Sequence, residues 1–590
     1  MKRQFFSLFL ILMAATAVWA APALRGAFTV TQADGTLLTV EQFGDEFFHW
    51  TETADGTLVV PTRQGYFVAV IDDKGKLTAS DVLAHEAQLR SSKEQQLVSQ
   101  QATRRTLFHQ QGQRMLAERR TMSISVGSKY LPHVGSPRVL TILAAYQDLD
   151  FIVNEPKLAF DQYLNGDEII DLGNKNTLQL CSVKQYFNTS SKGQFTPQFD
   201  VIGPVKLPQD VAYYGGMSAT GSDDKFSQLC KDTYQAVKDS VADWSIYDND
   251  NDGNVELVCI IFAGYGQNQG GENNTIWAKA SPQNIAIDNN MRISFFNCCS
   301  ELFNPARPQY INGTGTFIHE MSHCMGLPDL YQTNGNYANN QGMESWSIMD
   351  YGLYNNNGFA PAPYNAWERE VMGWSLMEPI SAPTQVNLLK PWEDGGTAYK
   401  IVNSSDENEY IVMENIQKQG LNKYAKGHGL LVYHVAYPYS EIKMMDCPNN
   451  QVGHPAVAVV PASGLLINTS LAGNDKKYTR AEWTASMASV PFPGDSAVTE
   501  LTLQQELPNY VFYNGDPLAV ELHNITESED GSVSFDFVEA PSSGIHTLKL
   551  DAQEYSNHSY YDLQGRRIAK SQKPKANGLY IHQGKKIVIR

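Results

Sequence analysis

The stretch GTGTFIHEMSHCMGLPDLY, from Gly313 to Tyr331, carries the most informative pattern in this sequence. Its two histidines, His319 and His323, are four residues apart. In a helix, positions i and i+4 lie on one face, so both imidazoles can point at one place. Glu320 lies about a hundred degrees around the helix, beside that place. The pattern predicts a zinc centre with Glu320 as general base, and the alternative is a helix that carries two surface histidines.

A third zinc ligand is expected soon after this helix. Gly326 can end the helix in the left-handed conformation, and Pro328 prevents the helix from resuming. Asp329 lies just beyond the turn, where its carboxylate can return to the metal. Three protein ligands leave one position open for water, as in catalytic zinc sites. Zinc lowers the pKa of such a water to about 7, which makes Glu320 an effective base.

A second motif, SWSIMDYG, follows from Ser345 to Gly352. It places Met349 in a tight turn and resembles the methionine turn that underlies the metal in metzincin peptidases. Tyr351 could reach the metal and stabilise an oxyanion, as a tyrosine at the matching place does in the astacins. The alternative is that Tyr351 is a packed aromatic side chain.

Other carboxylates and thiols offer weaker alternatives. Three glutamates could supply the third ligand in a gluzincin-like site, namely Glu344, Glu368 and Glu370. Of the seven cysteines, none precedes Cys181, so a thiolate from the N-terminal region cannot block the metal. Any latency must therefore use another group, such as an aspartate. The scattered cysteines show no disulfide framework.

The N-terminus predicts export. Lys2 and Arg3 precede a short apolar run that ends at Ala20, the pattern of a signal peptide cleaved after Ala20. The alternative is a retained membrane anchor. The formal net charge of −18 argues against nucleic acid as a partner.

The chain of 590 residues is long enough for several domains. Residues 21–125 predict β-rich structure followed by a helical linker, which forms either a regulatory prosegment or a plain β domain with its linker. Apolar runs at Arg138–Asp148 and Glu256–Gly266 predict buried strands, and Asp223–Trp244 predicts a helix. These elements indicate an α/β catalytic domain over 126–380.

Strand patterns then predict an all-β sandwich over 381–539, a linker at 540–544 and a β module at 545–590. The expected fold class is therefore multidomain: an α/β (α+β) metzincin-like peptidase domain flanked by a β-rich prosegment and C-terminal β-sandwich domains. The last module resembles a type IX secretion sorting domain, a short β-sandwich that would engage secretion machinery. The alternative is a small accessory β domain.

With these motifs, the chain resembles the M6 family of secreted metallopeptidases, the immune inhibitor A type. The resemblance extends over about 135–440 and includes the blocks Tyr186–Pro208, Tyr247–Ala280 and EYIVMENIQ at 409–417. It implies a prosegment, a metzincin-type endopeptidase domain and a following β-sandwich. It also implies His319, His323 and Asp329 as zinc ligands and Glu320 as general base.

A second metal is suggested by DNDNDGNVE, which runs from Asp248 to Glu256. Its alternating carboxylates before a glycine suit calcium, with Asp248, Asp250 and Asp252 as ligands. An EF-hand would need a glutamate at the twelfth position, which is Cys259 here. An acidic solvated loop is the alternative.

The sequence thus predicts a secreted, monomeric zinc endopeptidase that is made as a zymogen and cleaves polypeptides. A surface adhesin that keeps a zinc site without catalysis is the main alternative. The intact Glu320 argues against the adhesin, because binding alone does not need that carboxylate.

Overall fold

The computed structural model describes most of the chain, in several ranges: 21–119 except 47, 130–167, 179–216, 225–333, and 342–539 except 445, 452, 468–477, 517 and 519, followed by four short strands near the C-terminus. Two compact units are present, Met1–Glu539 and Ala540–Arg590. No helix among these residues is long and apolar enough to cross a membrane. The predicted signal peptide, residues 1–20, lies outside the described residues.

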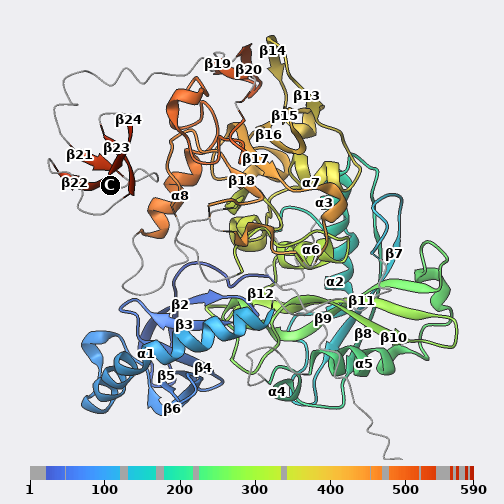
Figure 1. The fold of residues 1–590 in the computed structure, drawn as a ribbon. Coiled ribbons are helices and arrows are strands. Elements are labelled where there is room, and N and C mark those ends of the chain that lie inside the picture. The colour runs from blue at the N-terminus through green and yellow to red at the C-terminus, as the bar shows by residue number, and fades with distance from the viewer. Residues whose placement is uncertain are drawn as a thin grey trace, which may run out of the picture. The chain divides into compact units, whose positions relative to one another are not determined.

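The N-terminal region forms an antiparallel sheet of sequential strands that a long helix covers (Figure 1). Hairpin turns that contain a glycine at positive φ, such as Gly35 and Gly75, join neighbouring strands. The strands are β1 (Phe28–Thr31), β2 (Leu37–Gly44), β3 (His49–Thr53), β4 (Leu58–Thr62), β5 (Gly65–Ile71) and β6 (Leu77–Leu83). The helix is α1 (Ser92–Arg119).

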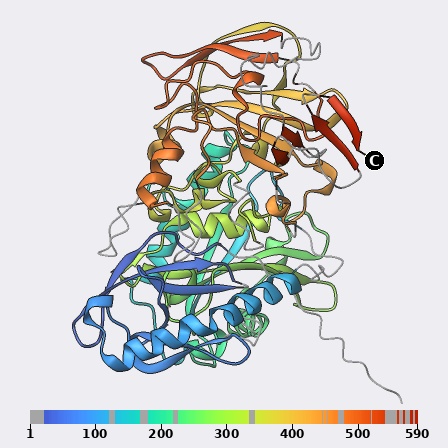
Figure 2. The same cartoon turned by 60° about the vertical axis from the view of Figure 1, so that its left-hand side comes forward.

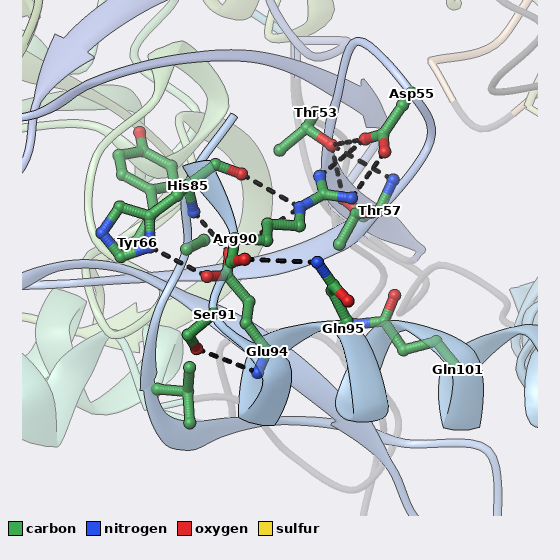
Figure 3. A network of polar contacts seen from close by, with 12 residues as sticks. Thr53, Asp55, Thr57, Tyr66, His85, Arg90, Ser91, Glu94, Gln95 and Gln101 are labelled. Carbon is green, nitrogen blue, oxygen red and sulfur yellow. Dashed lines mark hydrogen bonds and ion pairs between the residues drawn. The ribbon is translucent and has the colours of Figure 1, made fainter. Parts of the chain in front are cut away.

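A network of polar side chains holds the start of α1 on this sheet (Figure 3). Arg90 donates two hydrogen bonds to Asp55, of 2.6 and 2.8 Å. His85 contacts Glu94 at 2.9 Å, and Gln101 exchanges hydrogen bonds with the backbone of Leu58. The predicted helical linker is therefore a helix that is fastened to the sheet.

The central sheet has the strand order β10-β11-β9-β7-β8, with β12 paired to β11. Strands β8, β7, β9 and β11 are parallel, whereas β10 and β12 are antiparallel to β11. The strands are β7 (Arg138–Ala145), β8 (Gln198–Lys206), β9 (Asn254–Tyr265), β10 (Lys279–Ala286), β11 (Arg292–Asn304) and β12 (Arg307–Ile311). The apolar runs that predicted strands correspond to β7 and β9, which are buried almost throughout.

Helices lie around this central sheet (Figure 1). They are α2 (Pro156–Asn165), α3 (Val183–Ser190), α4 (Val211–Tyr214), α5 (Phe226–Val237) and α6 (Thr314–His323). A further helix, α7 (Ala366–Val371), contacts β16 (Asp406–Ile416) of another sheet. Helix α5 is shorter than the predicted helix over Asp223–Trp244, because a short 3-10 turn, Trp244–Tyr247, follows it. Helix α6 packs against β10 and β11 and shares one hydrophobic core with α2, α3 and β17.

Two further sheets follow the central sheet. One has the order β13-β15-β16-β17-β18 and the other β14-β20-β19, and residues of both form one core cluster. Their strands are β13 (Glu378–Pro379), β14 (Thr384–Leu389), β15 (Ala398–Asn403), β16 (Asp406–Ile416), β17 (Gly429–Ala436), β18 (Val457–Val459), β19 (Val520–Glu527) and β20 (Val533–Glu539). The expectation of an all-β unit was wrong in one respect: helix α8 (Arg480–Ala488) begins with a capping box at Thr479 and buries Trp483.

The C-terminal unit contains one four-stranded antiparallel sheet within its described residues, in the order β22-β21-β23-β24. The strands are β21 (Ser559–Tyr561), β22 (Arg567–Lys570), β23 (Gly578–His582) and β24 (Lys585–Ile589). The described strands therefore show a single sheet where a short sandwich was predicted. The whole chain has a mixed α/β fold with several sheets, as the sequence predicted at that level.

Candidate metal centre

Helix α6 positions the two histidines deep inside the protein. All ten of its residues are buried. Gly315 allows the helix to approach its neighbour, because a Cβ there would lie 2.0 Å from the carbonyl oxygen of Leu353. In both views α6 lies between the central sheet and the sheet that contains β17 (Figures 1 and 2). The histidines therefore project from a fixed backbone.

The predicted ligands converge in this structure. Nε2 of His319 and Nε2 of His323 lie 3.3 and 3.1 Å from Oδ1 of Asp329. All three side chains are completely buried, and their ligand atoms lie within 4.8 Å of one another. Ligands 2.0–2.1 Å from a tetrahedral metal stand about 3.3 Å apart. The three residues therefore fit a zinc ion.

Backbone carbonyls fix the orientation of both imidazoles. Nδ1 of His319 donates to the carbonyl oxygen of Ile348 at 2.8 Å, and Nδ1 of His323 donates to that of Leu327 at 2.8 Å. Because a carbonyl oxygen only accepts, each Nδ1 carries the hydrogen and each Nε2 presents a lone pair. Burial lowers the pKa of His319, although Asp329 opposes that shift. The neutral ring is the form that binds a metal.

Asp329 reaches the histidines because α6 ends sharply. Gly326 has φ +102°, and its N–H bonds the carbonyl oxygen of His323 at 2.9 Å. A Cβ on Gly326 would meet only the ring of Tyr130, at an acceptable 3.5 Å, so the backbone conformation is what favours glycine here. The chain therefore turns back after α6, and the carboxylate of Asp329 lies next to the histidines of that helix.

The segment around Met349 supports the ligands from the other side. Met349 is fully buried, and its carbonyl oxygen accepts a hydrogen bond from the N–H of Leu330, next to Asp329. The preceding residue, Ile348, supplies the carbonyl that orients His319. The motif that resembled a methionine turn thus contacts the imidazole of His319 and the backbone next to Asp329.

Glu320 lies beside the ligands and has an unexpected partner. Its Oε1 accepts a hydrogen bond of 2.6 Å from the backbone nitrogen of Ala21, almost 300 residues earlier in the chain. Burial raises the pKa of Glu320 well above that of an ordinary carboxyl, while the bond from Ala21 acts in the opposite direction. The group placed on the predicted base is therefore a backbone nitrogen, where the sequence had suggested an aspartate.

The residues after Ala21 are bound in the manner of a peptide. Trp277 donates its indole N–H to the carbonyl oxygen of Ala21 at 2.7 Å, and the hydroxyl of Tyr354 donates to that of Pro22 at 2.7 Å. The N–H of Leu24 donates to the carbonyl oxygen of Asn268 at 2.8 Å. Because these bonds involve the backbone of the segment, they do not depend on its side chains. Sequence analysis missed all of these partners.

Tyr351 lies against this N-terminal segment. The guanidinium carbon of Arg25 lies 3.1 Å from the centroid of the Tyr351 ring, and the guanidinium contacts Glu344 at 2.6 Å. Tyr331 lies between Tyr351 and His319, with ring centroids 6.1 and 6.5 Å from theirs. The described contacts of Tyr351 thus match a packed aromatic, and its role toward an oxyanion stays a prediction.

The three alternative glutamates are engaged elsewhere. Glu344 contacts Arg25, Glu368 accepts a hydrogen bond from Ser347, and Glu370 contacts Lys400. The cluster of potential metal ligands in this part of the described chain contains Asp329 and none of these glutamates.

The ligands of the proposed calcium loop stay a prediction, and the structure brings Asp248 and Asp250 together with Glu256. Ligand atoms of Asp248, Asp250 and Glu256 lie within 4.8 Å of one another. Asp252 is outside this cluster, because its Oδ1 accepts hydrogen bonds from the backbone and side chain of Asn254. The sequence pattern missed Glu256 because this residue lies near the start of strand β9, from where its carboxylate points back to the loop.

Comparisons with known proteins agree with this geometry. Residues 138–375 match the immune inhibitor A peptidase M6 catalytic domain. The chain is 27% identical over 278 residues to immune inhibitor A of Bacillus thuringiensis subsp. alesti, a match that covers 41% of this chain and 40% of that protein. It is 23% identical over 299 residues to the pre-pro-metalloprotease PrtV of Vibrio cholerae serotype O1, covering 44% and 31%. The matches therefore span well under half of either relative, and they support an M6 metallopeptidase domain.

Proposed function

We propose that this protein is a secreted zinc-dependent endopeptidase of the M6 metallopeptidase type. The observation that carries the proposal is the convergence of His319, His323 and Asp329, with Glu320 next to them on the same helix. The match over 138–375 supports the same chemistry. Polypeptides are the substrate class of a peptidase, and the negative charge of the chain disfavours nucleic acid.

In the proposed mechanism, three residues of this site bind the metal and one transfers protons. His319, His323 and Asp329 would hold zinc, which when bound supplies a Lewis acid for the scissile carbonyl and for water. Glu320 accepts the proton of the attacking water and passes it to the nitrogen of the leaving amine. Its raised pKa favours the step in which it accepts a proton.

The same site explains how the protein would be made as a zymogen. The backbone nitrogen of Ala21, 2.6 Å from Oε1 of Glu320, would compete with the attacking water for the base. If signal peptidase cuts after Ala20, the nitrogen on Glu320 becomes an α-ammonium group. An ammonium beside a buried carboxylate forms an ion pair, which would hold the base more firmly than an amide does. The prosegment 21–125 would thus block catalysis with its own first residue.

Other functions stay proposals on weaker support. A calcium ion at Asp248, Asp250 and Glu256 would neutralise three clustered carboxylates. The C-terminal unit would serve as a sorting module for secretion machinery, a proposal that rests on its sequence resemblance alone.

The experiment that tests the main proposal compares the matured protein with its Glu320→Ala variant on an unfolded protein substrate. Zinc content is determined for both proteins. We expect both to bind zinc and only the native form to cleave, with the variant slower by about 100-fold or more. If both bind zinc and neither cleaves after any processing, the peptidase proposal fails and a binding protein that retains a zinc site is favoured.

A further inference from the structure

Arg25 occupies a buried pocket built by later parts of the chain. Its side chain is 11% exposed, and its Nη1 donates to Oε2 of Glu344 at 2.6 Å. The guanidinium lies over the ring of Tyr351, 3.1 Å from its centroid, and 5.9 Å from the ring of Trp483. Trp483 also donates its indole N–H to Glu344 at 3.3 Å. A carboxylate and two aromatic rings therefore surround one cation.

A second carboxyl group, that of Asp350, lies next to Glu344 at this pocket. Asp350 is 1% exposed, and its two oxygens accept hydrogen bonds from the N–H groups of Glu344 and Tyr351, at 2.7 and 2.8 Å. Burial and the charge of Glu344 raise the pKa of Asp350 to about 8, while Arg25 opposes that shift. Two carboxyl groups buried near each other are costly to ionise without a cation beside them. The pocket is built to receive one.

The position of the pocket relative to Glu320 assigns it to the substrate path. The segment from Ala21 to Arg25 is held by backbone hydrogen bonds, as a bound peptide would be. Its first nitrogen lies on Glu320, the group that in the proposed mechanism gives a proton to the leaving amine. Ala21 therefore occupies the place of the first residue after a broken peptide bond. Arg25 then stands in the place of the fifth.

We propose that the pocket formed by Glu344, Asp350, Tyr351 and Trp483 binds an arginine of the substrate, five residues beyond the scissile bond, once the prosegment has left. This inference rests on the proposed peptidase function. All four residues lie outside the prosegment, so the pocket persists after its release. Arginine suits it better than lysine, because a planar guanidinium can stack on Tyr351 and bond Glu344 together, whereas an ammonium is compact and more strongly hydrated.

The test uses the enzyme as it matures from the full chain and a set of peptides that differ at one position. The peptides carry Arg, Lys or Gln at the fifth residue after a common cleavage site, and a second set carries Arg at the third residue before it. We expect kcat/KM to favour Arg over Gln at the fifth position by at least about tenfold, with Lys intermediate, and no such preference at the other position.

Variants assign this preference to the pocket. Glu344→Gln is expected to reduce the Arg preference to within about twofold, and an unchanged zinc content shows that the variant folds. Asp350→Asn is the second variant, expected to weaken the preference in the same direction. Glu370→Gln is the matched control, because Glu370 is a similarly buried glutamate that contacts Lys400 outside the pocket.

The unprocessed chain gives a readout that does not need activity. Arg25→Gln and Glu344→Gln should each increase hydrogen exchange at the N–H of Leu24, because each removes the same buried ion pair. Cleavage of all peptides at equal rates would contradict the proposed arginine pocket, and so would an Arg preference that survives Glu344→Gln. Neither result would contradict the proposed peptidase function. Absence of cleavage of every peptide by zinc-loaded enzyme would instead contradict the proposed function.

Discussion

The two histidines of the candidate metal centre are oriented by backbone carbonyl groups. The carbonyl oxygens of Ile348 and Leu327 determine which nitrogen of each histidine faces Asp329. This arrangement leaves the ligand atoms about as far apart as a tetrahedral ion requires. At this scale the chemistry therefore depends on a few atoms whose positions the backbone determines.

Removing one ligand should separate metal binding from folding. Asp329→Ala is expected to lower zinc affinity by at least about 100-fold, because even partners that only orient ligands contribute 10–100-fold. Competition with a chelator of known affinity measures the change. Glu320→Gln is the control that keeps all three ligands and should retain zinc. An Asp329→Ala variant with native zinc affinity would exclude Asp329 as a ligand.

At the scale of elements, the end of α6 matters as much as the helix itself. The helix places two ligands one turn apart, and the turn at Gly326 supplies the third. In the N-terminal region, α1 is held by a polar network in which His85 contacts Glu94 at 2.9 Å (Figure 3). His85 also contacts Asp34 at 2.9 Å. Contacts at one end of each helix position α6 and α1. Substitutions at those ends should therefore affect the stability of more than the substituted residue.

Gly326→Ala should destabilise the turn that carries Asp329. An alanine at φ +102° costs about 1–2 kcal/mol, and relaxation of the turn would move Asp329 from the histidines. We expect a lower free energy of unfolding together with weaker zinc binding. Gly395→Ala is the matched control, since Gly395 has φ +90° with open space around its Cβ. Equal loss of zinc affinity in both variants would show that the turn has no special role.

The hold of α1 on its sheet should weaken as pH rises. Burial alone would lower the pKa of His85, but Asp34 and Glu94 outweigh it, so the folded pKa is raised above 6.5. A raised pKa means that the stabilisation is complete below the unfolded value and is lost as pH increases through the folded one. Hydrogen exchange of the α1 amides should therefore accelerate above that pH beyond the intrinsic rate.

The His85→Gln variant supplies the comparison for this pH effect. It cannot become charged, so its α1 amides should already exchange faster at acidic pH, without the additional change as pH rises. An identical pH profile in the native protein and the variant would assign the effect to another group.

At the scale of the whole molecule, distant segments meet at the predicted catalytic base. Ala21 from the N-terminal region, Trp277 from the segment before β10 and Tyr354 from beyond the methionine turn all converge next to Glu320. The bound segment therefore makes the state of the N-terminus part of the site. Latency of the enzyme should depend on which residue comes first in the chain once the signal peptide has been removed.

Adding one residue to the N-terminus that signal peptidase leaves tests this dependence. A glycine inserted between Ala20 and Ala21 would displace the new ammonium by about 3.5 Å from the place that Ala21 occupies. We expect the unprocessed protein to lose latency, measured as cleavage of a fluorogenic protein substrate, with the N-terminus verified by mass spectrometry. A glycine inserted after Gly35, in the open turn between β1 and β2, is the matched control. Unchanged latency with the verified extension would contradict the role of the N-terminal nitrogen.

Much of the fold and the metal site could be predicted because their signals are local. The apolar runs of β7 and β9 indicated buried strands, and the spacing of His319, Glu320 and His323 requires only a helix. By contrast, α8 was missed within a region of strand patterns. The calcium pattern led to Asp252 because alternation along a loop does not reveal that Glu256 returns to it.

The sequence alone predicted the three ligands and the base, since helical periodicity and a glycine stop act within about ten residues. Tertiary structure alone decided the contacts of the N-terminal segment. Ala21 lies against Glu320, and Arg25 lies against Glu344 and Tyr351. These partners are about 300 residues apart in the chain, and no local pattern links them. They meet because sheets and helices pack around common cores, and burial then requires each charged group to find a partner of opposite charge.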